Sequence, residues 1–354
     1  MRRFVLALPL GLALAAAPAL ADEIKFPGKS LANVEIVSET YEEVAYKIAG
    51  SIQKEATPNI VDIVRTAGKS TRYIGAERKM ARGDWKGAVA DFTQISTNER
   101  LKDEEKWMKS YAQFYAAECY RNMGANPEAI AAYQSVLEDN PKSRFYAQVK
   151  LGIGACKMAS GDRAGARQAF AELEGDARSK KLGERWANEA NFRLAEISEG
   201  EDKVPEALER YRKVQAASAG QKGNAGQRAQ INVSRLSAKM DPSKADFASN
   251  ELEKLVAAEN ANAAADPEVL AAAYNALGDV YAAKGDHKKS LLSYLRVATV
   301  EELKAVQSEA PKALYGASVE FEKTKGDDWK VRSDQLKAQL KAMYPSSIWA
   351  RKVG

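Results

Sequence analysis

One small side chain recurs along this sequence at nearly regular steps. Ala88 is followed by Phe92 and Ile95, which places one small and two large residues on a single helical stripe. A similar stripe starts about every 40 residues, at Ala129, Ala166, Ala207, Ala248 and Ser290. The copy around Ala248 and Leu252 is degenerate and is inferred from the double-length interval between Ala207 and Ser290. A chain with this repetition is expected to fold as a stack of helix pairs, in which each pair contacts only its neighbours.

The copy around Gly278 shows what such a unit contains. Leu277, Gly278 and Tyr281 put a large apolar residue, a residue without a side chain and an aromatic ring on one helical face. Gly278 is expected to let a second helix come close, with Tyr281 filling the space beside it. Gly285-Asp286 then ends the helix.

This pattern resembles the tetratricopeptide repeat, a helix-turn-helix unit of about 34 residues. The resemblance implies a mostly α fold, a solenoid of about six to seven helix pairs over residues 67–354, with longer helices or loops than the family norm. The last pair is expected to contain Leu314 and Leu340. The segment 113–141 meets almost every position of the family pattern, with Gln113, Ala117, Tyr120, Gly124, Ala129, Tyr133, Val136 and Pro141.

The first 21 residues have the pattern of a secretory signal peptide. Arg2-Arg3 precede an apolar run that ends in small residues at Ala21. A membrane anchor is disfavoured because the run is short and Asp22-Glu23 follow it directly. We therefore expect residues 1–21 to be removed and the mature protein to be periplasmic or secreted. No later stretch is apolar enough to predict a membrane span.

Residues 22–66 have the period of β-strands. Val34 and Ile36 alternate with polar residues, and so do Val44, Tyr46 and Ile48. Further short extended runs predict a meander that curls into a small barrel, similar in shape to SH3-like or Sm-like modules. Because so short a segment has a marginal core, we expect it to pack on the first repeat and cover its apolar face. A separate binding role is the alternative.

The charge argues against a nucleic-acid partner. The formal net charge is +5, and two of the cations, Arg2 and Arg3, lie in the signal peptide, whereas nucleic-acid binding needs a concentrated basic surface. Two local asymmetries are either ordinary helix surface or a means of steering a partner. The basic one contains Arg65, Lys69, Arg72, Arg78, Lys79, Arg82 and Lys86. The acidic one contains Glu196, Glu199, Glu201, Asp202, Glu206 and Glu209.

No residue pattern indicates an enzyme. His287 is the only histidine, and packing at the repeat turn explains it. Cys119 and Cys156 occupy equivalent positions of adjacent repeats, about 8–10 Å apart, which is too far for a disulfide. We therefore expect two buried thiols. No Gly-x-Ser-x-Gly motif or phosphate loop is found, so no catalytic residue, cofactor or metal is expected.

The resemblance implies a function in holding a protein or peptide on the concave face of the array. Its layout is similar to that of exported repeat proteins that act as cell-envelope assembly and division scaffolds. Two alternatives stay open: a self-associating structural protein and an envelope hydrolase with paired carboxylates. Transfer of the family's binding positions to this sequence gives Tyr73, Glu77, Met80, Tyr111, Phe114, Glu118, Arg121, Asn122, Leu151, Met158, Phe192, Glu196, Glu199, Asn275 and Asp279.

Overall fold

The computed structural model describes residues 21–218, 224–263, 265–345 and 347–353. Except for Ala21, the expected signal peptide lies outside these residues. The chain forms two compact units, of which the first contains the described residues up to Cys119 together with Ser135–Tyr146. The second contains Tyr120–Gln134 and the described residues from Ala147 onward. No helix among the described residues is long and apolar enough to cross a membrane.

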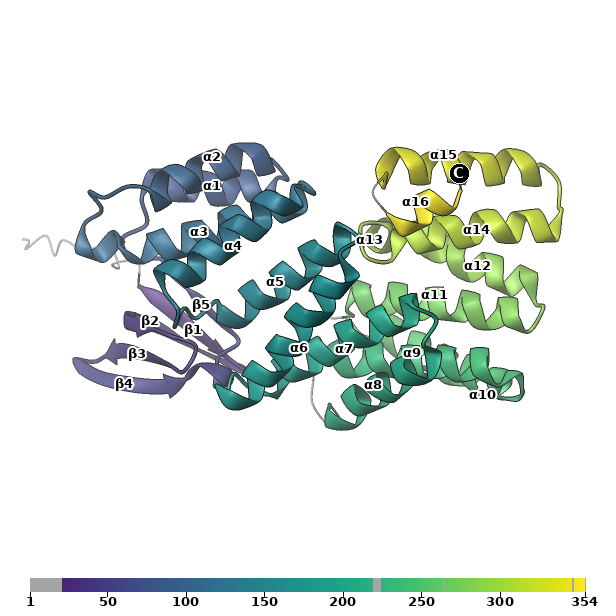
Figure 1. Cartoon of the computed structure of the whole chain (residues 1–354), viewed down its shortest axis with the longest axis horizontal. Helices are drawn as coiled ribbons and strands as arrows, with labels where there is room; N and C mark the ends of the chain where they lie inside the picture. Colours follow the sequence, from purple (N-terminus) through teal and green to yellow (C-terminus); the bar gives the residue numbers. More distant parts are fainter. Residues whose placement is uncertain (1–20, 219–223, 264, 346, 354) are drawn as a thin grey trace, which may run out of the picture. The chain divides into compact units, whose positions relative to one another are not determined.

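A five-stranded antiparallel sheet opens the first unit (Figure 1). Its spatial order is β4-β3-β2-β1-β5, so the last strand returns to pair with the first. The alternating apolar residues face one core, which includes Ile24, Val34, Val44 and Ile63. The expected short antiparallel strands are confirmed, but only β1 to β4 form a meander, because β5 pairs with β1. The strands are β1 (Asp22–Phe26), β2 (Lys29–Glu39), β3 (Glu43–Ile48), β4 (Ser51–Ala56) and β5 (Asp62–Val64).

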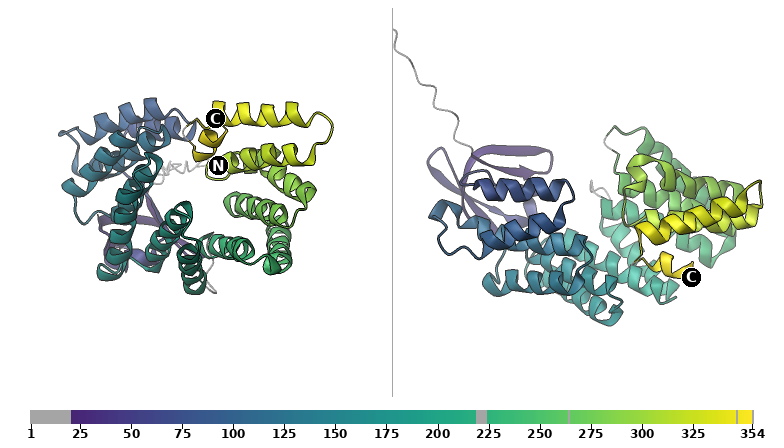
Figure 2. Two further views of the ribbon diagram at one scale, coloured as in Figure 1. Left: turned by 45° about the vertical axis from the view of Figure 1, so that its right-hand side comes forward. Right: turned by 90° about the horizontal axis from the view of Figure 1, so that it is seen from above.

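After the sheet, the described residues form helices in seven successive antiparallel pairs, followed by a short final helix. Figure 2 shows the pairs of the second unit following one another from teal to yellow. The pairs are α1 (Thr71–Ala81) with α2 (Trp85–Ser96), α3 (Trp107–Asn122) with α4 (Asn126–Asp139), α5 (Tyr146–Ala159) with α6 (Arg163–Ser179), α7 (Glu184–Gly200) with α8 (Val204–Ala217), α9 (Asn224–Met240) with α10 (Ala245–Asn260), α11 (Pro267–Ala283) with α12 (His287–Thr299), and α14 (Ala310–Thr324) with α15 (Trp329–Met343). The short helices are α13 (Glu301–Lys304) and α16 (Ile348–Lys352).

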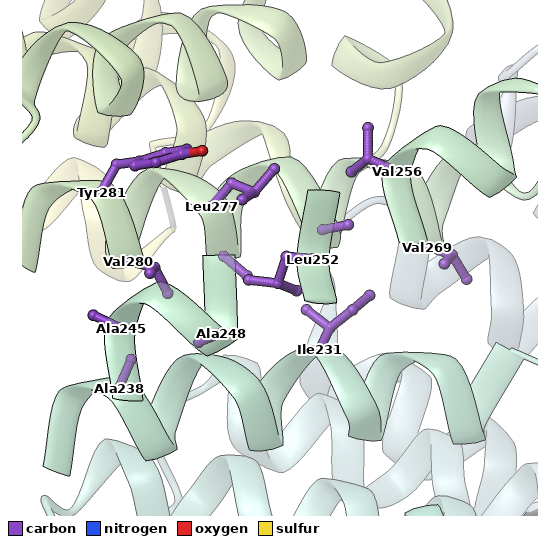
Figure 3. Close-up of a cluster of buried hydrophobic side chains, with 12 residues drawn as sticks. Ile231, Ala238, Ala245, Ala248, Leu252, Val256, Val269, Leu277, Val280 and Tyr281 are labelled. Carbon is purple, nitrogen blue, oxygen red and sulfur yellow. The ribbon is translucent and has the colours of Figure 1, made fainter. Parts of the chain in front are cut away.

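The recurring small residue lies in the second helix of each of the first six pairs and is buried in all of them. This includes Ala248 of the degenerate fifth unit, which is confirmed as part of α10. In Figure 3, Leu252 of the same helix lies between Ile231 of α9 and Leu277 of α11. A small side chain is needed here because the second helix packs closely against its neighbours. The residues that recur with the repeat period are therefore those that form the core of the stack.

Close helix approach at Gly278 is confirmed. A Cβ atom built on Gly278 would lie 2.6 Å from the ring of Tyr294 in α12, and one built on Gly316 of α14 would lie 2.7 Å from the same ring. The ring is thus held between two glycines, and its hydroxyl donates to Asp279 Oδ1 at 2.6 Å. The expectation that Tyr281 fills this space is wrong, because Tyr281 packs with the α9–α10–α11 cluster.

The sheet is fixed to α3 through Arg65. Its Nη1 donates to Glu39 Oε1 at 2.6 Å, and its Nε lies 3.1 Å from Asp22 Oδ2. The guanidinium also lies over the Trp107 ring of α3, 4.7 Å from the ring centroid. The Trp107 indole in turn donates to the carbonyl of Ala67. Arg65, Asp22 and Glu39 are almost fully buried, so each charge depends on its partners.

A second set of bonds joins Glu39 to the second helix pair. Glu39 Oε2 accepts from Tyr111 Oη at 2.6 Å and from Arg144 Nη1 at 3.2 Å. Burial raises the pKa of Tyr111 well above its usual value, so the phenol stays protonated and donates. These bonds connect the sheet to α3 and to the segment after α4. The expectation that the module packs on the first repeat did not include these bonds to the second pair.

Candidate protein-binding surface

A row of charged side chains runs along the first helices of the second unit. On α7, Glu189, Arg193 and Glu196 are spaced by four and three residues and therefore share one face. Arg228 and Arg235 likewise share one face of α9, because they lie two helical turns apart. We call the set the first-helix ladder. Its members are Glu189, Arg193, Glu196 and Glu199 of α7, Arg228 and Arg235 of α9, Glu268 and Asp279 of α11, and Lys312 of α14.

One end of the ladder is organised by Arg193 and Arg228. Arg193 donates to Glu189 at 2.8 Å and to Glu196 at 3.0 Å. Arg228 lies 3.9 Å from Glu196 and 3.4 Å from Glu268, and its guanidinium covers the Phe192 ring at 4.3 Å. Only 7% of the Arg228 side chain is exposed, against 37% of Glu196 and 35% of Glu268. The buried Arg228 guanidinium thus holds both carboxylates in place, while the carboxylate side chains remain partly exposed to solvent.

The other end of the ladder is organised by Arg235. Its two Nη atoms donate to the two carboxylate oxygens of Glu199 at 2.7 and 2.6 Å, which is a bidentate pair. Arg235 also lies 3.7 Å from Asp279, and Lys312 Nζ donates to Asp279 at 2.6 Å. Four first helices are therefore connected in a chain of ion pairs.

The pKa values of two ladder carboxylates follow from these contacts. Burial raises the pKa of Glu199, but the Arg235 guanidinium outweighs this and holds it below its usual value. Burial also raises the pKa of Asp279, but Lys312 together with Arg235 outweighs this and holds that pKa below its usual value. Both groups are therefore anionic at neutral pH. A two-carboxylate hydrolase needs one acid with a raised pKa, and neither of these carboxyls supplies it.

Five of the residues transferred from the family pattern are buried. Phe114 stacks on Phe145, with centroids 4.2 Å apart, and Asn275 donates to the carbonyl of Glu309. Expecting these five to line an open face was wrong because their side chains point into the helix stack. A buried side chain cannot contact a partner without local unfolding. The five are Tyr73, Tyr111, Phe114, Phe192 and Asn275.

The remaining transferred residues are at least partly accessible. Leu151 and Met158 pack against the buried cluster around Phe170, whereas Glu77 is paired with Lys69. Only Glu196, Glu199 and Asp279 belong to the ladder, and a binding role for the others stays a prediction. Half-buried are Glu77, Met80, Glu118, Leu151, Met158, Glu196, Glu199 and Asp279, and exposed are Arg121 and Asn122.

The transfer missed the basic half of the ladder, namely Arg193, Arg228, Arg235 and Lys312. The spacing of Arg193 from Glu189 and Glu196 was a signal in the sequence, because it predicts ion pairs on one helix face. The acidic asymmetry of the fourth repeat is largely neutralised in the structure. Arg167 pairs with Glu201 at 2.8 Å, and the ladder cations hold Glu196 and Glu199. This acidity is therefore not a free negative field.

The cysteines and the histidine have structural surroundings. Cys119 and Cys156, both in the described part of the chain, are buried and are not joined in a disulfide, as expected. His287 Nδ1 lies 2.8 Å from the buried Glu320 Oε2. Within residues 21–218, 224–263, 265–345 and 347–353, no cluster of three or more His, Cys, Asp and Glu side chains could hold a metal ion.

Comparisons with known proteins agree with the repeat architecture. The family model described as tetratricopeptide repeat matches residues 111–143. The Rap conjugation gene regulator of the plasmid pLS20, solved in complex with the Phr* peptide, has 13% identity and a TM-score of 0.51, over 78% of this chain and 75% of that one.

A tetratricopeptide repeat protein from Parabacteroides merdae has 14% identity and a TM-score of 0.46, over 75% of this chain and 96% of that one. No curated protein matches the sequence. At these identities the structural likeness concerns the fold.

Proposed function

We propose that this chain, which belongs to the tetratricopeptide repeat family, is an exported scaffold without catalytic activity that holds a protein or peptide partner on its first-helix ladder. The helical repeat fold is typical of protein–protein interaction. The peptide complex of the pLS20 regulator supports a peptide-binding use of this fold. The observation that carries the proposal is the placement of half-exposed carboxylates over buried arginines.

The ladder is suited to binding because its charged groups are already in position. Arg228 and Arg235 are held by several partners each, so little side-chain entropy remains to be lost when a partner arrives. The more exposed atoms belong to Glu196 and Glu268. Carboxylate oxygens accept hydrogen bonds only, so a matching partner presents N–H or O–H donors. Backbone amides and lysine or arginine side chains both meet this requirement.

The absence of catalytic activity is part of the proposal. Glu199 and Asp279 are stabilised as anions by neighbouring cations, which suits recognition better than proton transfer. A general acid or base works best with a pKa near the operating pH, and lowered carboxyl pKa values are far from that condition.

Export is proposed from the sequence of the first 21 residues. If residues 1–21 are removed, N-terminal sequencing of protein purified from the periplasm or the medium should begin at Asp22. A chain recovered there that still begins at Met1 would contradict cleavage. The cell-envelope setting is proposed from the similarity of the layout to exported repeat scaffolds.

Neutral isosteres at the exposed carboxylates test the binding face. Glu196→Gln combined with Glu268→Gln keeps the side-chain shape and removes two accessible charges. This variant should bind a partner captured from the envelope fraction more weakly than the unaltered protein. Glu209→Gln is the matched control, because Glu209 is exposed on α8 outside the ladder. If the control and the double variant lose the same affinity, the ladder is not the binding face.

A further inference from the structure

We propose that the turn between α1 and α2 docks the protein onto an anionic membrane surface. In the structure, some cations of the basic stretch from Arg65 to Lys86 pair with carboxylates and others do not. Arg65 and Lys69 are held by carboxylates, and Arg72 and Lys79 both pair with Asp91, at 3.4 and 2.6 Å. In the described part of the chain no ion pair holds the remaining three, which are the exposed Arg78, Arg82 and Lys86.

These three cations lie around one turn. Arg78 and Arg82 are one helical turn apart at the end of α1, and Lys86 is the second residue of α2. Gly83, with φ +76°, allows the tight connection between the helices. The nearby carboxylate, Asp84, is engaged as the cap of α2, where it accepts from Gly87 N at 2.9 Å. The turn therefore presents an excess of positive charge.

Helix stabilisation does not explain all of this charge. A cation near the carboxyl end of α1 is favoured by the helix dipole, which accounts for Arg78 and Arg82. Lys86 lies in the first turn of α2, where the dipole opposes a cation. At the corresponding turn between α11 and α12, Lys284 pairs with Asp246 and Lys289 with Asp286, and among its described lysines Lys288 alone is exposed without an ion pair. The α1–α2 turn has three such cations.

A tryptophan at the same turn favours a lipid surface over an acidic protein. Trp85 is the first residue of α2 and is half-buried between Asp84 and Lys86 in the sequence. Tryptophan is enriched at membrane interfaces because its indole has an apolar body and one polar N–H. Three separate flexible cations also suit a diffuse anionic surface, to which each lysine or arginine adds about five-fold in affinity.

Co-sedimentation with vesicles tests this proposal. Vesicles of phosphatidylglycerol and phosphatidylcholine in about equal parts should bind the protein at low salt, and pure phosphatidylcholine vesicles should not. Arg78→Gln, Arg82→Gln and Lys86→Gln together should lower the partition coefficient about 100-fold. Because all three side chains are exposed, the circular dichroism spectrum should not change.

The control removes three exposed cations elsewhere. Lys239→Gln, Lys288→Gln and Arg296→Gln together change the net charge equally and should lower the partition coefficient less than about five-fold. Equal losses in both triple variants, or no binding of the unaltered protein to anionic vesicles, would overturn the proposal. Binding to polyglutamate without binding to vesicles would overturn it in favour of an acidic protein partner.

Discussion

Replacing Glu39 with alanine is expected to destabilise the first unit by about 3–5 kcal/mol. Glu39 is the common acceptor of Arg65, Arg144 and Tyr111. Its removal leaves two nearly buried guanidiniums without their shared anion, and breaking such a network costs the full desolvation of the remaining charges. Amide hydrogen exchange of β2 and α3 measures the loss locally, which suits a chain of two units better than a single melting temperature.

Glu35→Ala is the matched control on the same strand. Glu35 is exposed and lies 3.7 Å from Lys47 across the sheet, so its loss should change stability by less than about 1 kcal/mol. If the two variants exchange equally fast, the Glu39 network does not fix the sheet to α3, and the module is held by its apolar contacts instead.

Gly278→Leu is expected to destabilise the second unit by about 1–3 kcal/mol. Even the first atom of the new side chain would lie 2.6 Å from the Tyr294 ring, which is well inside van der Waals contact. The ring cannot retreat, because Gly316 lies on its other side and Asp279 holds its hydroxyl. Helices α11, α12 and α14 must therefore separate, and exchange of their amides should rise together.

The control for this prediction is Gly175→Leu in α6. A Cβ on Gly175 meets nothing within 4 Å, and leucine has a higher helix propensity than glycine by several tenths of a kcal/mol. Stability should therefore stay equal or rise. Unchanged amide exchange in Gly278→Leu would show that α11 and α12 can move apart at little cost, which contradicts the close packing.

The repeat architecture could be read from the sequence because it depends on local spacing. Ala88 and its counterparts recur at one position of the second helix in the first six pairs, and only a small residue fits there. Even the weak fifth unit was located correctly at Ala248. The strands of the sheet were likewise predicted from alternation, since Val34 and Val44 point to one core.

The binding face was harder to predict because it depends on the rotation of each first helix. Neighbouring residues on a helix point about 100° apart, so a shift of one residue moves a side chain from the surface into the stack. Phe114 shows this, since it stacks on Phe145. The pairing of Arg235 with Asp279 joins residues far apart in the chain. Such charges come together only because neighbouring repeats stack on one another in the fold.

Isothermal titration of the captured partner against the ladder variants tests the proposed function most directly. Glu196→Gln combined with Glu268→Gln should lower the affinity by at least about ten-fold, which corresponds to about 1.4 kcal/mol. Helicity should stay unchanged, and unfolding is measured on the same preparation because Arg228 loses both of its carboxylate partners. Glu209→Gln should bind as the unaltered protein does. Full affinity in the double variant, measured on a folded preparation, would contradict the claim that the partner binds to the first-helix ladder.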